Sequence, residues 1–288
     1  MNEIKLQAPG KINFGLDIIG KTENGYHLLK MVMQSVKLSD TITIKKLKDG
    51  NSTITLTTNN KELPTNSDNL IYKAAKLLMD EFNIEDSIHI HLEKRIPIAA
   101  GMAGGSTDAA AVLKGMNTLF SLSLSQDDLM KRGVTLGADI PYCIIGGTAL
   151  SEGIGEILTP ISTSLQGYII LVKPPINVST KWAYQNFKKE SVTKTPNIDL
   201  VVDGLKKNNL ATACAGMENV LEAVTIPAHP VIQQIKTRMQ ELGCSFSLMS
   251  GSGPTVFGLC EEKENAKLIT ETLQKEFPDS FVTLTTYQ

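Results

Sequence analysis

PIAAGMAGGSTDAA, at residues 97–110, gathers glycines and other small residues between a predicted strand and a predicted helix. The preceding SIHIHLEK alternates Ile88, Ile90 and Leu92 as a strand does, and the following DAAAVLKGMNTLF is rich in good helix formers. Glycine lets a backbone approach a phosphate closely, and a helix N-terminus offers unpaired N–H groups and a positive dipole end. The segment therefore predicts a phosphate-binding turn. The alternative is a glycine turn needed only for helix packing.

The predicted cradle is not one of the two commonest nucleotide motifs. No G-x-x-x-x-G-K-[ST] occurs in the chain, and no G-x-G-x-x-G stands in a dinucleotide-binding βαβ unit. The hydroxyls of Ser106 and Thr107 can donate hydrogen bonds or help to hold a magnesium ion. The residues that we assign to nucleotide binding in this segment are Pro97, Ile98, Ala99, Ala100, Gly101, Met102, Ala103, Gly104, Gly105, Ser106 and Thr107.

Outward from this segment, the periodicity predicts an α+β protein. A largely antiparallel sheet is expected over the first sixty residues, with an exposed turn at TENGYH (22–27), and a helix over 69–82. A short helix from Ser125 to about Arg132 and a turn at GADIPYC (137–143) follow. We place a domain boundary near residue 160, giving domains 1–160 and 161–288.

The second domain is expected to close as a small ferredoxin-like layer. GTALSEG and YIILVKPP are predicted strands on either side of the boundary, and SFSLMS, TVFGLC and FVTLTT are further predicted strands of the second domain. Its predicted helices cover about 179–188, 199–208, 229–242 with Gly243 as C-terminal cap, and 263–277.

The composition excludes several classes of protein. The chain is 42% hydrophobic and 20% charged with a net charge of −2, and it has no basic stripe of the kind that binds nucleic acid. No secretory signal or membrane-spanning run is evident, so we expect a cytoplasmic protein. Its four cysteines are far apart in sequence and are expected to be free, buried thiols.

Three segments together resemble the GHMP kinase superfamily over essentially the whole chain. They are APGKINFGLDIIG (8–20), the glycine-rich segment 97–110, and SGSGPTVFG (250–258). The resemblance implies a two-domain GHMP kinase fold, with an N-terminal ribosomal-protein-S5-like domain and a C-terminal ferredoxin-like domain, and it implies ATP and Mg²⁺ as cofactors. NGYH (24–27) and GADIPYC resemble the branch that phosphorylates a cytidine diphosphate-linked polyol of isoprenoid synthesis. Met102 departs from the leucine usual there, a volume-conserving change.

The resemblance also implies the catalytic residues. Asp139 in GADIPYC matches the aspartate that receives the hydroxyl proton, and Lys11 in PGKIN matches the second catalytic residue. The ammonium of Lys11 would keep Asp139 ionised and stabilise charge on the transferring group. By itself, either residue would be interpreted as part of a structural salt bridge.

For the acceptor, the same resemblance implies Asn13, Tyr26, His27 and Tyr184. Tyr26 and Tyr184 would sandwich the cytosine ring, and His27 would bond its edge or the adjoining diphosphate. The alternatives are that His27 serves only as a turn residue and that the second aromatic position falls on Trp182. Asn69 and Lys94 match positions near the adenine of the nucleotide.

Other interpretations remain open at this point. His89 and His91 share one face of a strand and could pair on a metal, although a polar solvent-side face explains the spacing better and we assign no metal ligand. The chain could be a homoserine-type or mevalonate-type member, or a non-catalytic nucleotide-binding regulator. The sequence leaves open whether the protein is a monomer or a homodimer.

Overall fold

The computed structural model describes residues 1–288, which form two compact units. Each unit is assembled from separate segments, and the long strands β1 (Glu3–Lys21) and β2 (His27–Leu47) contribute residues to both. The predicted boundary near residue 160 remains a prediction. Unit 1 comprises Met1–Gly10, Leu38–Ile96 and Ala103–Gly146, and unit 2 comprises Lys11–Lys37, Pro97–Met102 and Gly147–Gln288.

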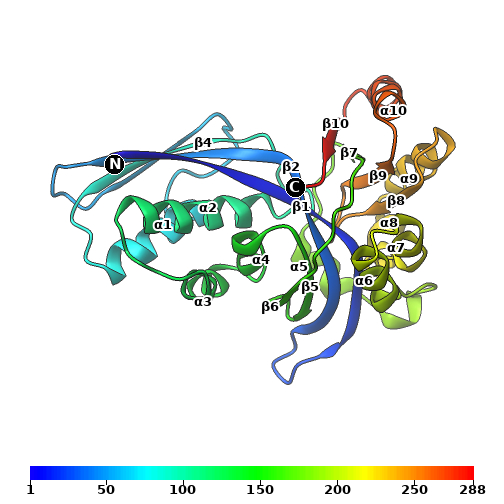
Figure 1. Cartoon of the computed structure of the whole chain (residues 1–288), viewed down its shortest axis with the longest axis horizontal. Coiled ribbons are helices and arrows are strands. Elements are labelled where there is room, and N and C mark those ends of the chain that lie inside the picture. Colours follow the sequence, from blue (N-terminus) through cyan, green and yellow to red (C-terminus); the bar gives the residue numbers. More distant parts are fainter. The chain divides into compact units, whose positions relative to one another are not determined.

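Unit 1 is a sheet with helices along one face (Figure 1). Besides its parts of β1 and β2, it contains β3 (Ile54–Thr58), β4 (Ser87–Glu93), α1 (Leu70–Glu81), α2 (Gly104–Leu119), α3 (Gln126–Leu136) and α4 (Ile140–Ile145). β4 runs antiparallel to β2 and parallel to β3. The expectation of a largely antiparallel sheet is therefore confirmed, with the β3–β4 pair as the exception.

The helix that follows the glycine-rich segment packs very closely on the sheet. A Cβ at Gly115 of α2 would lie 2.7 Å from Ile44 Cδ1 and 2.9 Å from Leu6 Cδ1, so only glycine lets the helix approach β1 and β2 this far. Buried Ala109, Ala110 and Val112 line the same helix. Small residues thus fix the depth of α2, and with it the place where the helix begins.

The expectation of a turn at GADIPYC is confirmed only at its start, where the Ile140 N–H donates to the Gly137 carbonyl, because Ile140–Ile145 forms the short helix α4. Proline is tolerated early in a helix, where the missing N–H would have no partner, and here Pro141 occupies such a position. Gly146, with φ of +67°, ends the helix, and its N–H donates to the carbonyl of Tyr142. Asp139 is consequently the residue that opens α4.

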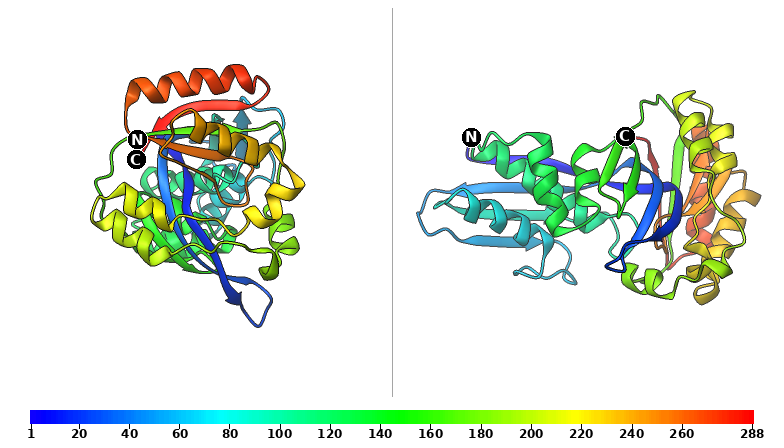
Figure 2. Two further views of the ribbon diagram at one scale, coloured as in Figure 1. Left: turned by 90° about the vertical axis from the view of Figure 1, so that its right-hand side faces the viewer. Right: turned by 90° about the horizontal axis from the view of Figure 1, so that it is seen from below.

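Unit 2 contains a four-stranded antiparallel sheet with the order β10-β7-β9-β8. The chain order β7-α9-β8-β9-α10-β10 with this strand order is the predicted ferredoxin-like arrangement, and α9 and α10 cover one side of the sheet (Figure 2). The strands of this sheet are β7 (Tyr168–Lys173), β8 (Phe246–Met249), β9 (Val256–Cys260) and β10 (Phe281–Thr286). Unit 2 also contains β5 (Thr148–Gly153) and β6 (Ile157–Pro160), which lie outside this sheet.

Four helices of unit 2 confirm the sequence predictions closely, and others were missed. α9 ends at Glu241, and the N–H groups of Gly243 and Cys244 donate to Gln240 and Met239, so the predicted glycine cap is a Schellman motif. The patterns did not predict α7, α8 and β6. The helices are α5 (Thr180–Asn186), α6 (Ile198–Lys206), α7 (Leu210–Gly216), α8 (Glu222–Ala228), α9 (Val231–Glu241) and α10 (Lys263–Glu276), with a 3-10 turn at Lys189–Ser191.

Two further whole-chain expectations can be compared with the structure. None of the helices combines the length and the apolar character needed to cross a bilayer. None of the four cysteines forms a disulfide, and only Cys214 among them is partly exposed.

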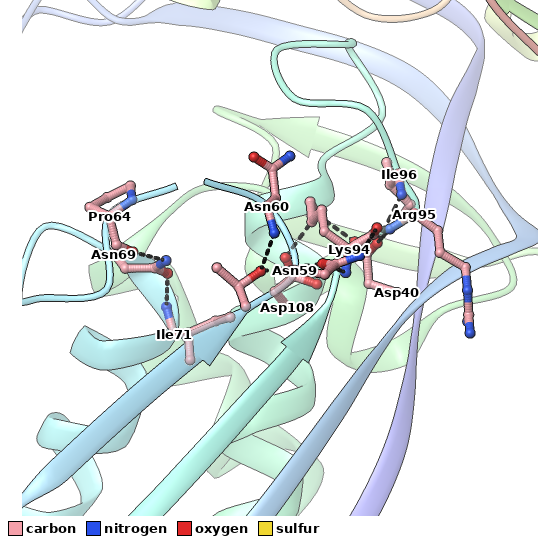
Figure 3. Close-up of polar contacts among 11 residues, drawn as sticks. Asp40, Asn59, Asn60, Pro64, Asn69, Ile71, Lys94, Arg95, Ile96 and Asp108 are labelled. Carbon is pink, nitrogen blue, oxygen red and sulfur yellow. Dashed lines mark hydrogen bonds and ion pairs between the residues drawn. The ribbon is translucent and has the colours of Figure 1, made fainter. Parts of the chain in front are cut away.

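A buried ion cluster joins β2, β4 and α2 in unit 1 (Figure 3). The Lys94 ammonium contacts the carboxylates of Asp40 and, at 2.8 Å, Asp108, and all three side chains are at most 4% exposed. Asp40 also accepts the backbone N–H groups of Arg95 and Ile96. With one ammonium and two carboxylates, the fully ionised cluster would bury an uncompensated negative charge. The pKa of Asp108 is raised to about 8, because the effect of burial outweighs the lowering by the Lys94 ammonium and the nearby Asp40 carboxylate also raises it.

The ion cluster predicts how stability depends on pH. Because Asp108 keeps its proton in the folded state and loses it near pH 4 when unfolded, the folded state binds more protons between about pH 4 and pH 8. The free energy of unfolding contributed by this group therefore falls as pH rises through that window. In urea titrations from pH 5 to pH 9, the free energy of unfolding should fall less with pH for Asp108→Asn than for the unmodified chain. The exposed Asp80→Asn serves as control. If the free energy of unfolding of Asp108→Asn fell as steeply as that of the unmodified chain, the raised pKa of Asp108 would be contradicted.

Candidate active site

The first half of the glycine-rich segment is held in a left-handed backbone by the turn at residues 250–253. Ala99 and Gly101 have φ of +50° and +70°. A Cβ at Gly101 would lie 2.2 Å from the carbonyl oxygen of Ser250, whose hydroxyl donates to the Gly101 carbonyl at 3.0 Å. Because no other residue fits here, the glycine is required by a backbone contact in addition to its positive φ. SGSGPTVFG therefore acts as the support of the predicted cradle.

Buried Asn219 fixes this supporting turn. Its side-chain amide donates to the carbonyls of Met249 and Gly251, both at 2.8 Å. Sequence reasoning missed Asn219, because nothing in its local pattern distinguishes it from a surface asparagine.

The second half of the segment opens α2 with no side chain over its N-terminus. Ala103 at the N-cap has φ of +54° and cannot cap with its methyl group, and the first turn carries no acidic residue. The leading N–H groups of a helix have no intrahelical partner, so those of Gly104, Gly105 and Ser106 are available to an anion. A Cβ at Gly104 would lie 2.9 Å from the Lys94 ammonium. The Lys94 ammonium thus occupies the space that a side chain at position 104 would need.

The first turn of α2 also carries polar side-chain atoms without protein partners. The Thr107 hydroxyl and one carboxylate oxygen of Asp108 are buried and make no hydrogen bond. The Ser106 hydroxyl is half-buried and likewise makes none. Buried polar atoms are nearly always satisfied, so a group of this kind at a helix N-terminus is typical of a ligand site.

The two predicted catalytic residues have different surroundings, each in its own unit. In unit 2, Lys11 is 5% exposed, its ammonium donates to the Asn13 side-chain oxygen at 2.6 Å, and no carboxylate pairs with it. A Cβ at Gly251 would lie 3.4 Å from the same ammonium, so the supporting turn lies beside it. In unit 1, Asp139 is half-buried and its carboxylate has no hydrogen-bond or ion-pair partner. Both residues are charged groups left without the partner that a structural salt bridge would supply.

The predicted acceptor residues form an aromatic group in unit 2 only in part. The His27 ring stacks on Tyr184 with centroids 5.4 Å apart, and Phe187 meets the same ring edge-on at 6.0 Å. Trp182 instead packs against His229, which favours Tyr184 over Trp182 as the second aromatic residue. Tyr26 lies at the exposed tip of the β1–β2 hairpin and is 65% exposed.

The His27 ring is suited to form a hydrogen bond with a neutral polar group. Partial burial lowers its pKa, and Lys21 lowers it further, so the ring is neutral at pH 7. Its Nε2 atom is buried without a hydrogen-bond partner. The stack therefore presents one unsatisfied ring nitrogen next to an aromatic face.

The remaining predicted residues serve the fold. Asn69 caps α1, accepting from the Ile71 N–H at 2.9 Å and donating to the Pro64 carbonyl at 2.7 Å (Figure 3). Lys94 is held in the ion cluster described above, whose two carboxylates sequence reasoning missed because they come from distant segments. His89 and His91 both hydrogen-bond the Thr57 hydroxyl, at 3.0 and 2.9 Å.

The chain matches two family models in order. Residues 69–147 match the GHMP kinases N terminal domain, and residues 187–279 match GHMP kinases C terminal. The first match includes the glycine-rich segment and Asp139.

Curated relatives cover nearly the whole chain. A 4-diphosphocytidyl-2-C-methyl-D-erythritol kinase of Lachnoclostridium phytofermentans is 53% identical over 93% of this chain and 91% of its own length. The protein of the same name from Acetivibrio thermocellus is 46% identical over 99% and 100%.

Solved structures share the fold at greater distance. A crystal structure of 4-(cytidine 5'-diphospho)-2C-methyl-D-erythritol kinase superposes with a TM-score of 0.83 at 28% identity, covering 99% of this chain and 100% of the other. A homoserine kinase from Cytophaga hutchinsonii superposes with a TM-score of 0.78 at 20% identity, covering 100% and 95%, which shows a common fold alone. On its family matches and on the identity to its relatives, the chain belongs to the GHMP kinases and, among them, to the family of 4-diphosphocytidyl-2-C-methyl-D-erythritol kinases.

Proposed function

We propose that this protein transfers the γ-phosphoryl group of ATP to the 2-hydroxyl of 4-diphosphocytidyl-2-C-methyl-D-erythritol, giving the 2-phosphate and ADP in the non-mevalonate isoprenoid pathway. The observation that carries this proposal is the 53% identity to a curated kinase of that name over 93% of the chain. A cytoplasmic location, and the choice between a monomer and a homodimer, remain predictions.

The phosphates of ATP are proposed to bind the uncapped start of α2 and the loop before it. Ala99, Gly101 and Ala103 have positive φ and the residues between them do not, an alternation typical of loops that turn successive N–H groups toward an anion. The following helix adds its dipole, and no acidic side chain in its first turn opposes a polyphosphate. Asn69 and Lys94 remain proposed neighbours of the adenine, in addition to the hydrogen bonds that they make in the fold.

The residues at the start of α2 fit a magnesium ion. Mg²⁺ in kinases takes only one or two protein oxygens and completes its shell with phosphate oxygens and water. No cluster of three acidic, histidine or cysteine side chains exists in the chain, while the Ser106 and Thr107 hydroxyls have no protein partner. These two hydroxyls would hold the ion, which when bound neutralises charge on the phosphates.

Asp139 is proposed to receive the proton of the acceptor hydroxyl. A carboxylate is a weak base with an ordinary pKa near 4, so it takes the proton late, as the oxygen is already bonding to phosphorus. Its freedom from any protein partner leaves it able to accept that hydrogen bond. Lys11 is proposed to neutralise charge on the transferring group, and Asn13 holds its ammonium in a fixed direction.

The cytidine head of the acceptor is proposed to bind at the His27–Tyr184 stack. An aromatic face and an unsatisfied ring nitrogen are what a cytosine ring requires for stacking and for an edge hydrogen bond. Tyr26, exposed in the same hairpin, is proposed to cover the other face of the base. Asn13 is proposed to contact the acceptor from the site of Lys11.

A panel of acceptors separates this proposal from its alternatives. ADP release should be measured with 4-diphosphocytidyl-2-C-methyl-D-erythritol, homoserine and mevalonate at equal concentration. The proposal requires turnover with the first compound only. Turnover with homoserine or mevalonate would assign a different acceptor, and no turnover with any would favour a non-catalytic regulator.

Asp139→Asn should remove most of the activity without weakening nucleotide binding. The amide keeps the shape of the side chain but cannot receive a proton, so we expect kcat to fall at least 100-fold, in line with the usual worth of general base catalysis. The affinity for ATP, measured by calorimetry, should change less than about twofold, because the backbone of the loop holds the phosphates. A variant with near-unmodified kcat would refute the role of Asp139.

Tyr184→Ala should mainly raise the KM for the cytidyl acceptor. Stacking binds the base equally in the ground state and the transition state, so its loss should leave kcat nearly unchanged and raise KM about tenfold, the effect of ~1.4 kcal/mol. Tyr26→Ala should act in the same direction. Trp182→Ala is the matched control, since Trp182 packs on His229 instead. A larger rise in KM for the control than for Tyr184→Ala would move the aromatic platform to Trp182.

A further inference from the structure

Lys114 is a half-buried cation with no acidic partner, and it lies at the opposite end of α4 from Asp139. Its ammonium, projecting from α2, donates to the carbonyls of Cys143 and Ile144 at 3.3 and 3.0 Å. Burial lowers its pKa, and no carboxylate lies within ion-pair distance to offset that cost. A lysine that only served solubility would keep its ammonium in water, so the partial burial of Lys114 requires another explanation.

The contact satisfies the C-terminal end of a very short helix. The last carbonyls of any helix lack intrahelical donors and carry the negative end of its dipole, where a cation is favourable. α4 has only six residues, too few to be stable without tertiary contacts. α4 also packs closely on α3 through Ile140, where a Cβ at Gly133 would lie 2.7 Å from Ile140 Cγ2. Lys114 therefore supplies a polar attachment for the C-terminal end of α4.

The same contact links the two helices that carry the proposed chemistry of unit 1. α2 begins at Gly104, directly after the phosphate-binding loop, and α4 begins at Asp139. The Asp139 carboxylate has no hydrogen-bond partner of its own, so its place depends on where the backbone at the start of α4 lies. Small displacements of a catalytic group cost large factors in rate, up to about 100-fold for 1 Å.

We propose that Lys114 is a positioning residue that fixes α4 against α2 and thereby holds Asp139 in place for proton transfer. This inference rests on the proposed function of Asp139. Lys114 touches neither substrate nor nucleotide in this account and acts only through the helix.

Four variants in the full chain test the proposal by steady-state kinetics. Lys114→Met keeps most of the aliphatic side chain and removes the donors, so kcat should fall about tenfold or more while the KM values for ATP and acceptor change less than about twofold. Lys114→Arg keeps a charged donor and should recover at least half of the lost activity. Lys131→Met removes an exposed lysine of α3 and is the matched control, with unchanged kinetics. Unchanged kcat in Lys114→Met would overturn the proposal.

The fourth variant, Lys114→Met combined with Asp139→Asn, shows whether Lys114 acts through Asp139. If it does, adding Lys114→Met to Asp139→Asn should lower the residual rate less than about twofold. The same tenfold loss in both backgrounds would overturn the proposal, because Lys114 would then act by another route.

Amide hydrogen exchange provides a readout that does not depend on activity. The N–H groups of Cys143 and Gly146 donate to the carbonyls of Asp139 and Tyr142, and they should exchange at least about tenfold faster in Lys114→Met but not in Lys114→Arg. Unchanged exchange would overturn the positioning role while leaving the proposed kinase function intact. Faster exchange together with an active Asp139→Asn would instead remove Asp139 as the base, and the proposal with it.

Discussion

The contact between Gly101 and the carbonyl of Ser250 is the constraint on which the proposed phosphate site depends. With 2.2 Å between that oxygen and any Cβ at position 101, the loop accepts only glycine and follows the shape of the supporting turn. Asn219 in turn fixes the supporting turn through two carbonyls. A loop held by backbone contacts is rigid before a ligand arrives, and its N–H groups need little reorganisation to meet an anion.

Charged side chains divide into those whose charge is compensated and those whose charge is not. Lys94 and Asp40 are buried as an ion pair beside Asp108, whereas Asp139 has no partner and Lys11 has only a neutral one. A carboxylate and an ammonium without counter-charges are unfavourable for stability and useful for chemistry that develops charge. Lys114 is intermediate, since helix carbonyls compensate its charge.

Local signals in the sequence predicted much of the fold. The helix after the glycine-rich segment, the strand of Ile88, Ile90 and Leu92, and the Gly243 cap each depend on near neighbours, and the structure confirms them. GADIPYC was misjudged because its helix has six residues and is held by Lys114 and Gly133, which no local pattern reveals. The partners of Lys94 were missed for the same reason, as Asp40 lies 54 residues away. For the candidate site, the sequence motifs predicted which residues to consider. Their burial and their unsatisfied polar atoms could be seen only in the structure.

The most direct test of the phosphate site is a crystal structure with a non-hydrolysable ATP analogue and 4-diphosphocytidyl-2-C-methyl-D-erythritol. The account predicts phosphate oxygens within hydrogen-bond distance of the N–H groups of residues 101–106, and the acceptor 2-hydroxyl within hydrogen-bond distance of the Asp139 carboxylate. A polyphosphate bound away from the start of α2, with those N–H groups facing only solvent, would contradict it.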